Sequence, residues 1–244
     1  MRDLLTDKID EFMTWVVPDP DECRRTAAEM AAREPNVPKE VLARSVVAYA
    51  RKKGLAIGGV TGIASSPLTF LPAAMADIAA TLRVEGTMAG VVAALLDPES
   101  LDAPERFRAD VIAVVFPAAL SQALRQLGIR VGEEVTKTLV RRLVTKGGFE
   151  AIAKLAGRFL GTRMTAKALA SKGVPLVGMG IGAGWNYLEV GAVGARAIAY
   201  HTGQPVGVGK LREMGRRLIP ERFRRRVAGG AGAADSNANA GTEA

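Results

Sequence analysis

The sequence predicts an all-α protein, a multi-helix bundle with Gly-rich apolar helices, and two observations carry this prediction. Apolar residues recur at three- and four-residue steps along most of the chain, which is the period of an α-helix, and no segment shows convincing β alternation. Small residues are abundant: 41 alanines and 27 glycines make 68 of the 244 residues, about 28%, whereas aromatic residues make 5%. Because small side chains let helix backbones approach closely, we expect tight helix packing.

The first three helices are expected before residue 54, with ends marked by prolines and short polar residues. Pro18 ends an amphipathic helix, Asp19 or Asp21 caps the next, and Pro38 starts the third. These helices run from Leu4 to Val16, from the cap to about Arg33, and from Pro38 to the basic Arg51-Lys52-Lys53.

The rest of the chain is also expected to be helical, up to a low-complexity tail. The expected helices cover residues 73–96, 104–127, 131–146, 148–160, 163–171, 175–201 and 207–226. Asp97-Pro98 stops the first of these, and the second is interrupted near Pro117 and closed by Gly128. The chain thus divides into an acidic amphipathic helical extension (1–37), a helical domain (38–203), a basic helix (204–227) and a disordered tail (228–244).

The net charge of +8 is spread unevenly, which indicates an anionic surface as partner. Residues 1–40 carry ten acids and six bases, whereas residues 210–226 carry eight bases and two acids. The alternative is that these charges are simply solvated helix faces. The N-terminus lacks the basic and apolar regions of a secretory signal, and Cys23 is the sole cysteine. We therefore expect a cytoplasmic protein that associates peripherally with a membrane.

Residues 54–76 contain no charged side chain and are long enough to cross a bilayer. Pro67 and Pro72 interrupt the run, and much of it is glycine, alanine and serine, so it is a poor single span. Three interpretations remain open: a buried helical hairpin in a soluble core, a re-entrant hairpin, or a broken span.

Glycines in two of the apolar segments recur at four-residue steps, which places them on one helix face. Such a face lets another helix pack against it backbone to backbone, either within a membrane or within a soluble bundle. The glycines expected at helix contacts are Gly58, Gly62, Gly178 and Gly182.

Isolated polar residues in the apolar helices are the strongest candidates for a buried polar site. Asp77, Thr81 and Glu85 follow one another at four-residue steps and so share one helix face. Asn186, Glu189 and Arg196 share a face of the late helix. Burying an unpaired carboxylate costs several kcal/mol, so these groups need partners. One economical arrangement packs the two helices with Asp77 near Asn186 or Arg196. The alternative is that Asp77 faces solvent.

Familiar catalytic and cofactor motifs fail on spacing or context. A single histidine, His201, excludes a multi-histidine metal site, and no nucleophile motif surrounds it or Cys23. The glycines of 178–184 match a dinucleotide fingerprint only by chance, since no βαβ pattern or following acid accompanies them. The sequence GQPVGVGKL has the wrong spacing for a phosphate loop. We expect no cofactor, and no nucleic-acid partner because the basic stretches lack interleaved aromatic residues.

The segment GVPLVGMGIGAGWNYLEVGAVGARAIAYH resembles the closing motif of EcsC-family proteins, through Pro175, Gly178, Gly182, Asn186 and Arg196. The earlier Gly-rich run that leads to Asp77 is similar to that family's apolar run, and the resemblance spans roughly residues 40–203. It implies a mainly helical protein near a membrane, accessory to transport or secretion, and it carries over no catalytic residue.

The leading hypothesis is a non-enzymatic protein whose apolar hairpin and basic helix contact anionic lipid or a membrane protein complex; oligomers are possible. The basic residues expected at the membrane surface are Lys210, Arg212, Arg216, Arg217, Arg222, Arg224, Arg225 and Arg226. Two alternatives remain: a soluble helical scaffold with internal glycine faces, and an enzyme with an acid-based site around Asp77, Glu85 and Glu189.

Overall fold

The computed structural model describes residues 15–61, 67–117, 134–135, 137–138, 140, 175–204 and 206–207. The chain divides into two compact units, residues 1–206 and 207–244. Of the described residues, all but Gly207 belong to the first unit.

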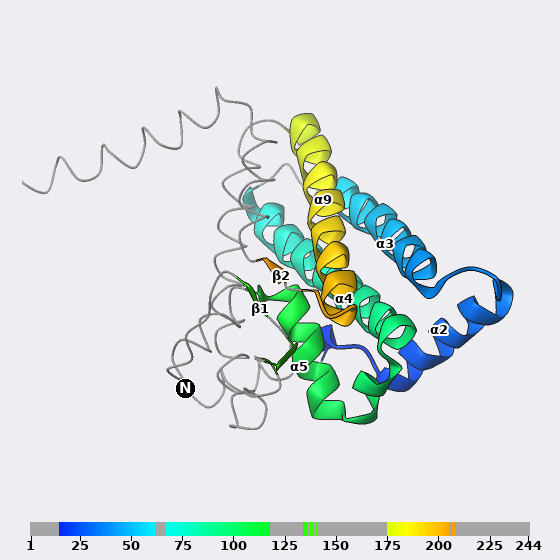
Figure 1. The fold of residues 1–244 in the computed structure, drawn as a ribbon. Coiled ribbons are helices and arrows are strands. Elements are labelled where there is room, and N and C mark those ends of the chain that lie inside the picture. Colours follow the sequence, from blue (N-terminus) through cyan, green and yellow to red (C-terminus); the bar gives the residue numbers. More distant parts are fainter. Residues whose placement is uncertain are drawn as a thin grey trace, which may run out of the picture. The chain divides into compact units, whose positions relative to one another are not determined.

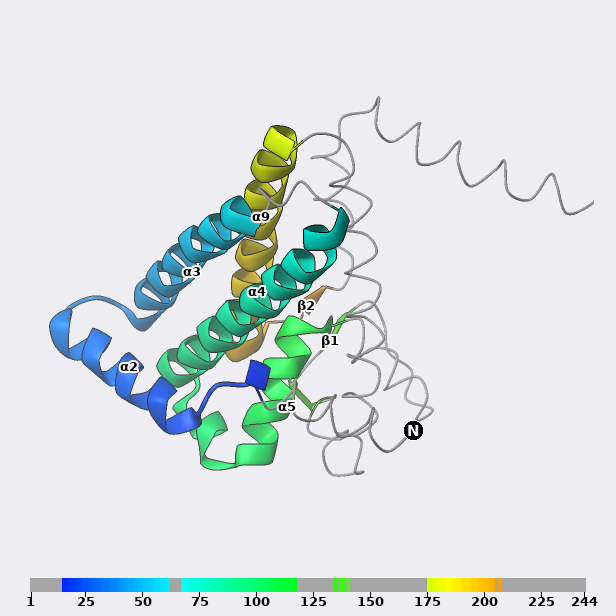
Figure 2. The ribbon, with the colours of Figure 1, turned by 180° about the vertical axis from the view of Figure 1, so that it is seen from behind.

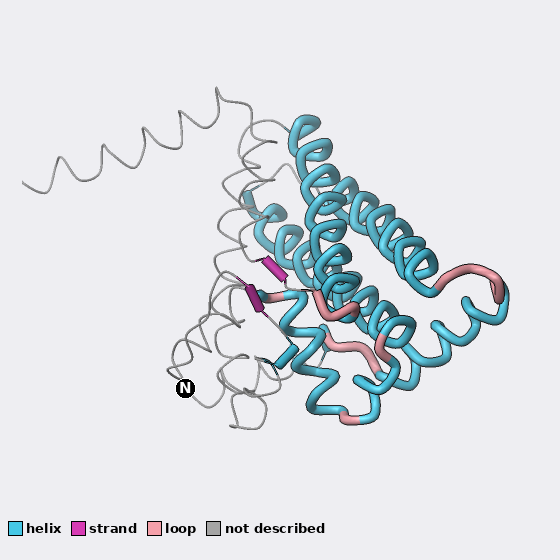
Figure 3. The backbone as a smooth tube through the Cα atoms, in the orientation of Figure 1, coloured by secondary structure: helices cyan, strands magenta, loops and turns pink. Residues whose placement is uncertain are grey.

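The described part of the chain is helical, and the predicted all-α class is confirmed (Figure 1). Its elements are α2 (Pro20–Arg33), α3 (Lys39–Thr61), α4 (Pro67–Leu96), η1 (Pro98–Asp102), α5 (Pro104–Val115), β1 (Glu134–Val135), α9 (Pro175–His201) and β2 (Val206–Gly207). The two strands are only two residues long and pair with each other, as Figure 3 shows among the predominant helices.

Helices α3, α4 and α9 form the centre of the fold. α3 and α4 are antiparallel, and α9 packs along α3 and also against α4. In both ribbon views, the end of α3, the start of α4 and the start of α9 lie at the same end of this bundle (Figures 1 and 2). Segments more than a hundred residues apart in sequence are therefore neighbours in space.

Shorter elements cover the rest of α4. α2 packs against α4 and buries Cys23 and Ala27, and the residue Val16 before it is fully buried. α5 packs on α4 from another direction, with Phe107 and Ile112 in the core. The region before residue 38 thus contributes to the main core.

Local sequence explains the helix ends. The expected cap at Asp19 is present: its Oδ1 accepts a hydrogen bond from the Asp21 backbone N–H at 3.0 Å. Pro20, Pro98 and Pro104 each stand in the first turn of an element, where a missing N–H has no intrahelical partner to lose.

Two predicted helix starts are wrong. The helix expected over 131–146 includes Glu134–Val135, which form β1, and the basic helix expected from residue 207 begins inside β2. Val135 and Val206 are β-branched, and backbone pairing between distant segments overrides the local helical period.

One further helix start differs from the prediction. α4 begins at Pro67 rather than near residue 73, because a proline in the first turn is compatible with a helix. The interruption predicted near Pro117 is confirmed: α5 ends at Val115, because Phe116 precedes Pro117 and leaves the helical conformation, with φ −122° and ψ 59°.

Candidate functional site

A buried polar cluster joins α4 to α9. Asp77, Thr81 and Glu85 lie on one face of α4 and are 1%, 3% and 0% exposed. From α9, the fully buried Asn186 donates two hydrogen bonds through Nδ2, to Asp77 Oδ1 at 3.0 Å and to Thr81 Oγ1 at 3.1 Å. The prediction that Asp77 is buried and paired with a residue of the late helix is confirmed. The cluster fixes the register of the two helices, since sliding either one breaks both bonds.

The other polar residues expected on α9 lie along the same helix. Arg196 is buried, and its Nε donates a hydrogen bond to the Val114 carbonyl of α5 at 3.0 Å. Of the two partners expected for Asp77, Asn186 is thus hydrogen-bonded to it, and Arg196 ties α9 to α5. Glu189 is partly buried.

Glycine backbones form the contact between α3 and α9. A Cβ atom added at Gly58 would lie 2.6 Å from the Gly182 carbonyl carbon, and one added at Gly182 would lie 2.9 Å from the Gly58 carbonyl oxygen. Gly54 faces Asn186 and Val190 at similar range. The predicted packing role is confirmed for Gly58 and Gly182, whereas the surroundings of Gly62 and Gly178 lie outside the described residues.

An ionic network lies at the opposite end of the bundle, where α4 and α9 finish. Lys137 Nζ lies 2.5 Å from Asp97 Oδ2, and His201 Nδ1 lies 3.3 Å from the same oxygen. Burial alone would raise the pKa of Asp97, but the hydrogen bonds and positive charge of His201 and Lys137 hold it well below its ordinary value. Asp97 is therefore ionised in the folded protein.

A second buried acid lies close to this network. Tyr200 donates a hydrogen bond from its hydroxyl to Asp110 Oδ1 at 2.5 Å, and both residues are buried. Burial raises the pKa of Asp110, an effect that the Tyr200 hydrogen bond and the nearby His201 oppose. The Tyr200 and His201 rings are in edge contact, 5.1 Å apart.

Sequence reasoning missed these groups. Asp97 had been interpreted only as a helix stop, and Asp110 was not singled out. A signal for Asp110 was present, since it stands in the apolar stretch ADVIAVV just as Asp77 stands in AAMADIAA. For Lys137 no local signal exists, because its partner is 40 residues away.

Large apolar side chains are exposed in the last part of α3 and in the first halves of α4 and α9. Leu55 is 46% exposed, Val60 71% and Met75 52%, and Trp185 of α9 is 44% exposed. We call these four residues the apolar end of the bundle. Exposed Lys52 and Lys53 precede Leu55 on α3, so positive charge borders the apolar end on this helix.

One described helix is long and apolar enough to cross a membrane by length and composition. It covers Met75–Leu96 and is mostly buried inside the protein, as the core helix of a soluble protein would be. The uncharged run 54–76 instead contributes to two helices, α3 and α4.

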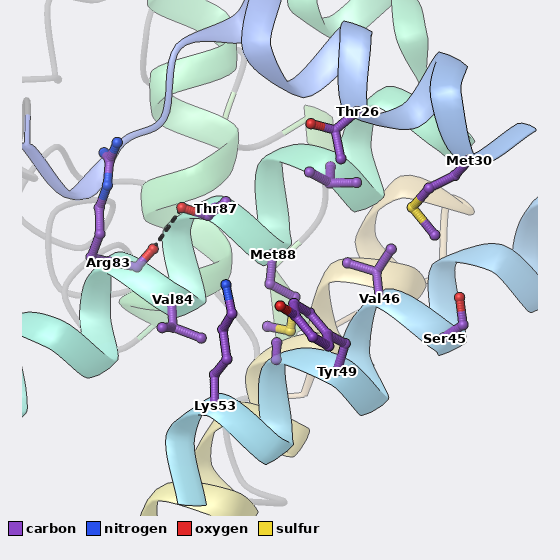
Figure 4. Close-up of a pocket in the computed structure, with 12 residues that line it drawn as sticks. Thr26, Met30, Ser45, Val46, Tyr49, Lys53, Arg83, Val84, Thr87 and Met88 are labelled. Carbon is purple, nitrogen blue, oxygen red and sulfur yellow. Dashed lines mark hydrogen bonds between the residues drawn. The ribbon is translucent and has the colours of Figure 1, made fainter. Parts of the chain in front are cut away.

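A groove of about 490 Å³ lies between α2, α3 and α4 (Figure 4). Its walls are mainly apolar, with Met30 from α2, Val46 from α3, and Val84 and Met88 from α4. Asp77, Glu85 and Glu189, the residues of the acid-based alternative, do not line it.

Cys23 is buried beneath α4, against the position of Gly90, where a Cβ would lie 2.7 Å from Sγ. Burial, together with the nearby charges of Glu22 and Asp19, raises the pKa of the thiol to about 12. A protonated, buried thiol is a poor nucleophile. Within the described ranges, no group of three or more His, Cys, Asp or Glu side chains is placed to hold a metal ion.

The basic residues expected at a membrane surface, from Lys210 to Arg226, lie outside the described residues. No protein-family model, curated protein or solved structure matches the chain. The class of the protein therefore rests on its fold, an all-α helical bundle.

Proposed function

We propose that the protein is a non-enzymatic, membrane-associated helical protein that binds an anionic lipid surface from the cytoplasm through the apolar end of the bundle. The observation that carries this proposal is the exposure of Leu55, Val60, Met75 and Trp185 in those halves of α3, α4 and α9 that meet at one end of the bundle. Exposed apolar side chains are common singly, but a group with adjacent lysines is typical of an interfacial surface.

The depth of contact follows from the spacing on α3. Val60 lies eight residues beyond Lys52, which is about 12 Å along a helix. If Lys52 and Lys53 stay at the headgroups, Val60 reaches the boundary of the acyl chains, the depth typical of shallow insertion. Trp185 belongs to the residue type enriched at that boundary.

The basic C-terminal sequence supplies the second contact in this proposal. Eight bases between Lys210 and Arg226 would each contribute about 1 kcal/mol beside anionic lipid. Membership of the EcsC family is part of the proposal, and it is supported by Gly182 and Asn186, two motif residues that hold α9 to α3 and α4.

Co-sedimentation with vesicles tests the proposal. The protein should pellet with vesicles of anionic phospholipid and less with neutral ones, and binding should weaken as salt is raised. The double substitution Leu55→Asp, Val60→Asp should abolish most binding. Val41→Asp is the matched control, since Val41 is 49% exposed at the start of the same helix.

Two outcomes would contradict the proposal. If the double variant pellets as well as the unchanged protein, the apolar end does not touch lipid. If the unchanged protein does not pellet with either vesicle, the soluble scaffold becomes the better explanation, with its glycine faces used for internal packing.

A further inference from the structure

The groove between α2, α3 and α4 has an apolar lining that the proposed membrane contact does not use. We propose that it binds a long-chain fatty acid, with the carboxylate on Lys53 and the carboxylate-proximal part of the aliphatic chain between the three helices. This inference is independent of the proposed function, because Lys53 is the only residue that the two could share.

The groove is elongated along two antiparallel helices. Its lining runs from Ser45 to Lys53 on α3 and from Arg83 to Val91 on α4, a rise of eight residue steps in each case, or about 12 Å. Because the helices are antiparallel, Lys53 and Arg83 lie toward the same end, and Val91 lies toward the other. The two cationic residues of the lining therefore lie toward one end of the groove, and its other end is lined by uncharged residues.

Its width favours an extended chain over a helix. A volume of about 490 Å³ over a length of about 12 Å gives a cross-section of about 40 Å². An α-helix with side chains is about 10 Å across, which is a cross-section of about 80 Å². A non-helical peptide would bury backbone polar groups against helices whose own groups are already paired. An aliphatic chain has no such groups, and Met30 and Met88 can adjust to its shape.

The charges of the groove lining favour a ligand with an anionic head group. The lining residues include two cations and no carboxylate. Arg83 is already engaged, since it donates to the backbone carbonyls of Trp15 and Val17. Lys53 is exposed, with its Nζ 4.8 Å from the centre of the Tyr49 ring, and in the described part of the chain it has no carboxylate within ion-pair distance.

Figure 4 shows how these side chains lie. Lys53 and Tyr49 extend from α3 toward Val84 and Met88 on α4, whereas the guanidinium group of Arg83 points away from Lys53. Thr87, whose hydroxyl donates to the Arg83 carbonyl at 2.9 Å, lies on the α4 wall of the groove. The ammonium group is thus placed over the groove, where it can pair with a carboxylate.

Competition between oleate and a fluorescent fatty acid tests the proposal on the full-length protein. Oleate should bind saturably at one site, and Thr87→Trp, which fills the groove from an exposed position, should weaken binding about tenfold or more, a loss of about 1.4 kcal/mol per tenfold. Ala48→Trp, at an exposed position of α3 outside the groove, is the matched control. Equal affinities for the two variants, or no oleate binding by the unchanged protein, would overturn the proposal.

Lysine variants test the position of the head without disturbing the core. Lys53→Ala should weaken oleate binding about fivefold, as expected for an exposed charge pair, Lys53→Arg should restore it, and the neighbouring Lys52→Ala should have no effect. Oleyl alcohol, which has the same chain without a carboxylate, should bind the unchanged protein and Lys53→Ala equally. Equal loss in Lys53→Ala and Lys52→Ala would overturn the assignment of the head.

A brominated fatty acid distinguishes groove binding from contact at the apolar end. Neither Trp15 nor Trp185 lines the groove, so Tyr49→Trp is used to place a fluorophore on its α3 wall. Without vesicles, the brominated fatty acid should quench Tyr49→Trp more strongly than the unchanged protein. The Leu55→Asp, Val60→Asp variant should lose vesicle binding and keep oleate binding, so each proposal can fail alone. Equal quenching of Tyr49→Trp and the unchanged protein would overturn binding in the groove.

Discussion

At one end of the central bundle, Leu55, Val60 and Met75 are exposed to solvent, whereas at the other end Asp97, Lys137 and His201 pair inside the protein. The exposed apolar residues contribute little to the fold, and the ionic residues contribute little to the surface, since His201 is buried and the side chains of Lys137 and Asp97 are 20% and 17% exposed. Between them, glycine contacts and the Asn186 cluster hold the helices together. The comparison indicates that the stability of the fold depends on the glycine contacts, the Asn186 cluster and the Asp97 network. The apolar end is therefore available for binding.

The largest effect is expected at the glycine contact in the middle. Gly182→Leu should destabilise the protein by about 5 kcal/mol or more, or prevent folding, because no side chain fits against the Gly58 backbone. Gly58→Ala is the milder test and should cost about 2–3 kcal/mol.

Neighbouring Gly59 is the control, since a Cβ there would meet no atom within 4 Å. Gly59→Ala should be neutral or stabilise by up to about 1 kcal/mol through helix propensity. Thermal and denaturant unfolding measure all three variants. A Gly58→Ala protein as stable as Gly59→Ala would show that α3 and α9 are not in backbone contact.

The buried polar cluster should give the next largest effect. Asp77→Ala should cost about 3–5 kcal/mol, because it removes one of the two acceptors of the buried Asn186 amide and leaves a cavity between α4 and α9. Asp77→Asn keeps the volume and should cost less. The free energies of unfolding, measured by chemical denaturation, test this prediction. If Asp77→Ala is as stable as the unchanged protein within error, the cluster does not hold α4 to α9.

The ionic end should give a smaller effect that depends on pH. The pKa of Asp97 is lowered in the folded state, so its pairing stabilises the protein above the unfolded pKa of about 4 and this contribution is lost as pH falls toward the folded value. Asp97→Asn should therefore cost about 2 kcal/mol at pH 7, and the difference should shrink at pH 3.

Melting temperatures of both proteins across this range provide the measurement. Asp102→Asn is the control for net charge, because the Asp102 side chain is 72% exposed in its pair with Arg24, and it should change stability by less than about 1 kcal/mol. A constant difference between Asp97→Asn and the unchanged protein from pH 7 to pH 3 would contradict the assignment.

The smallest effect on stability is expected at the apolar end. Val60→Asp should leave the free energy of unfolding within about 0.5 kcal/mol, because Val60 is 71% exposed. Unfolding in urea measures this. A large loss would mean that the apolar end is part of the core, and the contrast between the two ends would disappear.

Sequence reasoning succeeded where a local period carried the information. The four-residue steps of Asp77, Thr81 and Glu85, and of Gly54 and Gly58, predicted which faces of α3 and α4 would be buried. It failed where the information was not local. Asp97 and His201 are 104 residues apart in sequence, and the groove exists because of where α2 packs. Likewise, Glu134–Val135 had a helical pattern, but pairing with β2 determined their conformation.

The rate at which Cys23 reacts with a thiol reagent would report local opening of the fold. Since this is the single thiol of the chain and it is covered by α4, a thiol-reactive dye can reach it only when α2 separates from α4. Labelling rates at rising denaturant would therefore separate partial opening of α2 from global unfolding, as hydrogen exchange does for backbone amides. Fatty acid bound between α2, α3 and α4 should slow that labelling, and no residue need be changed to see it.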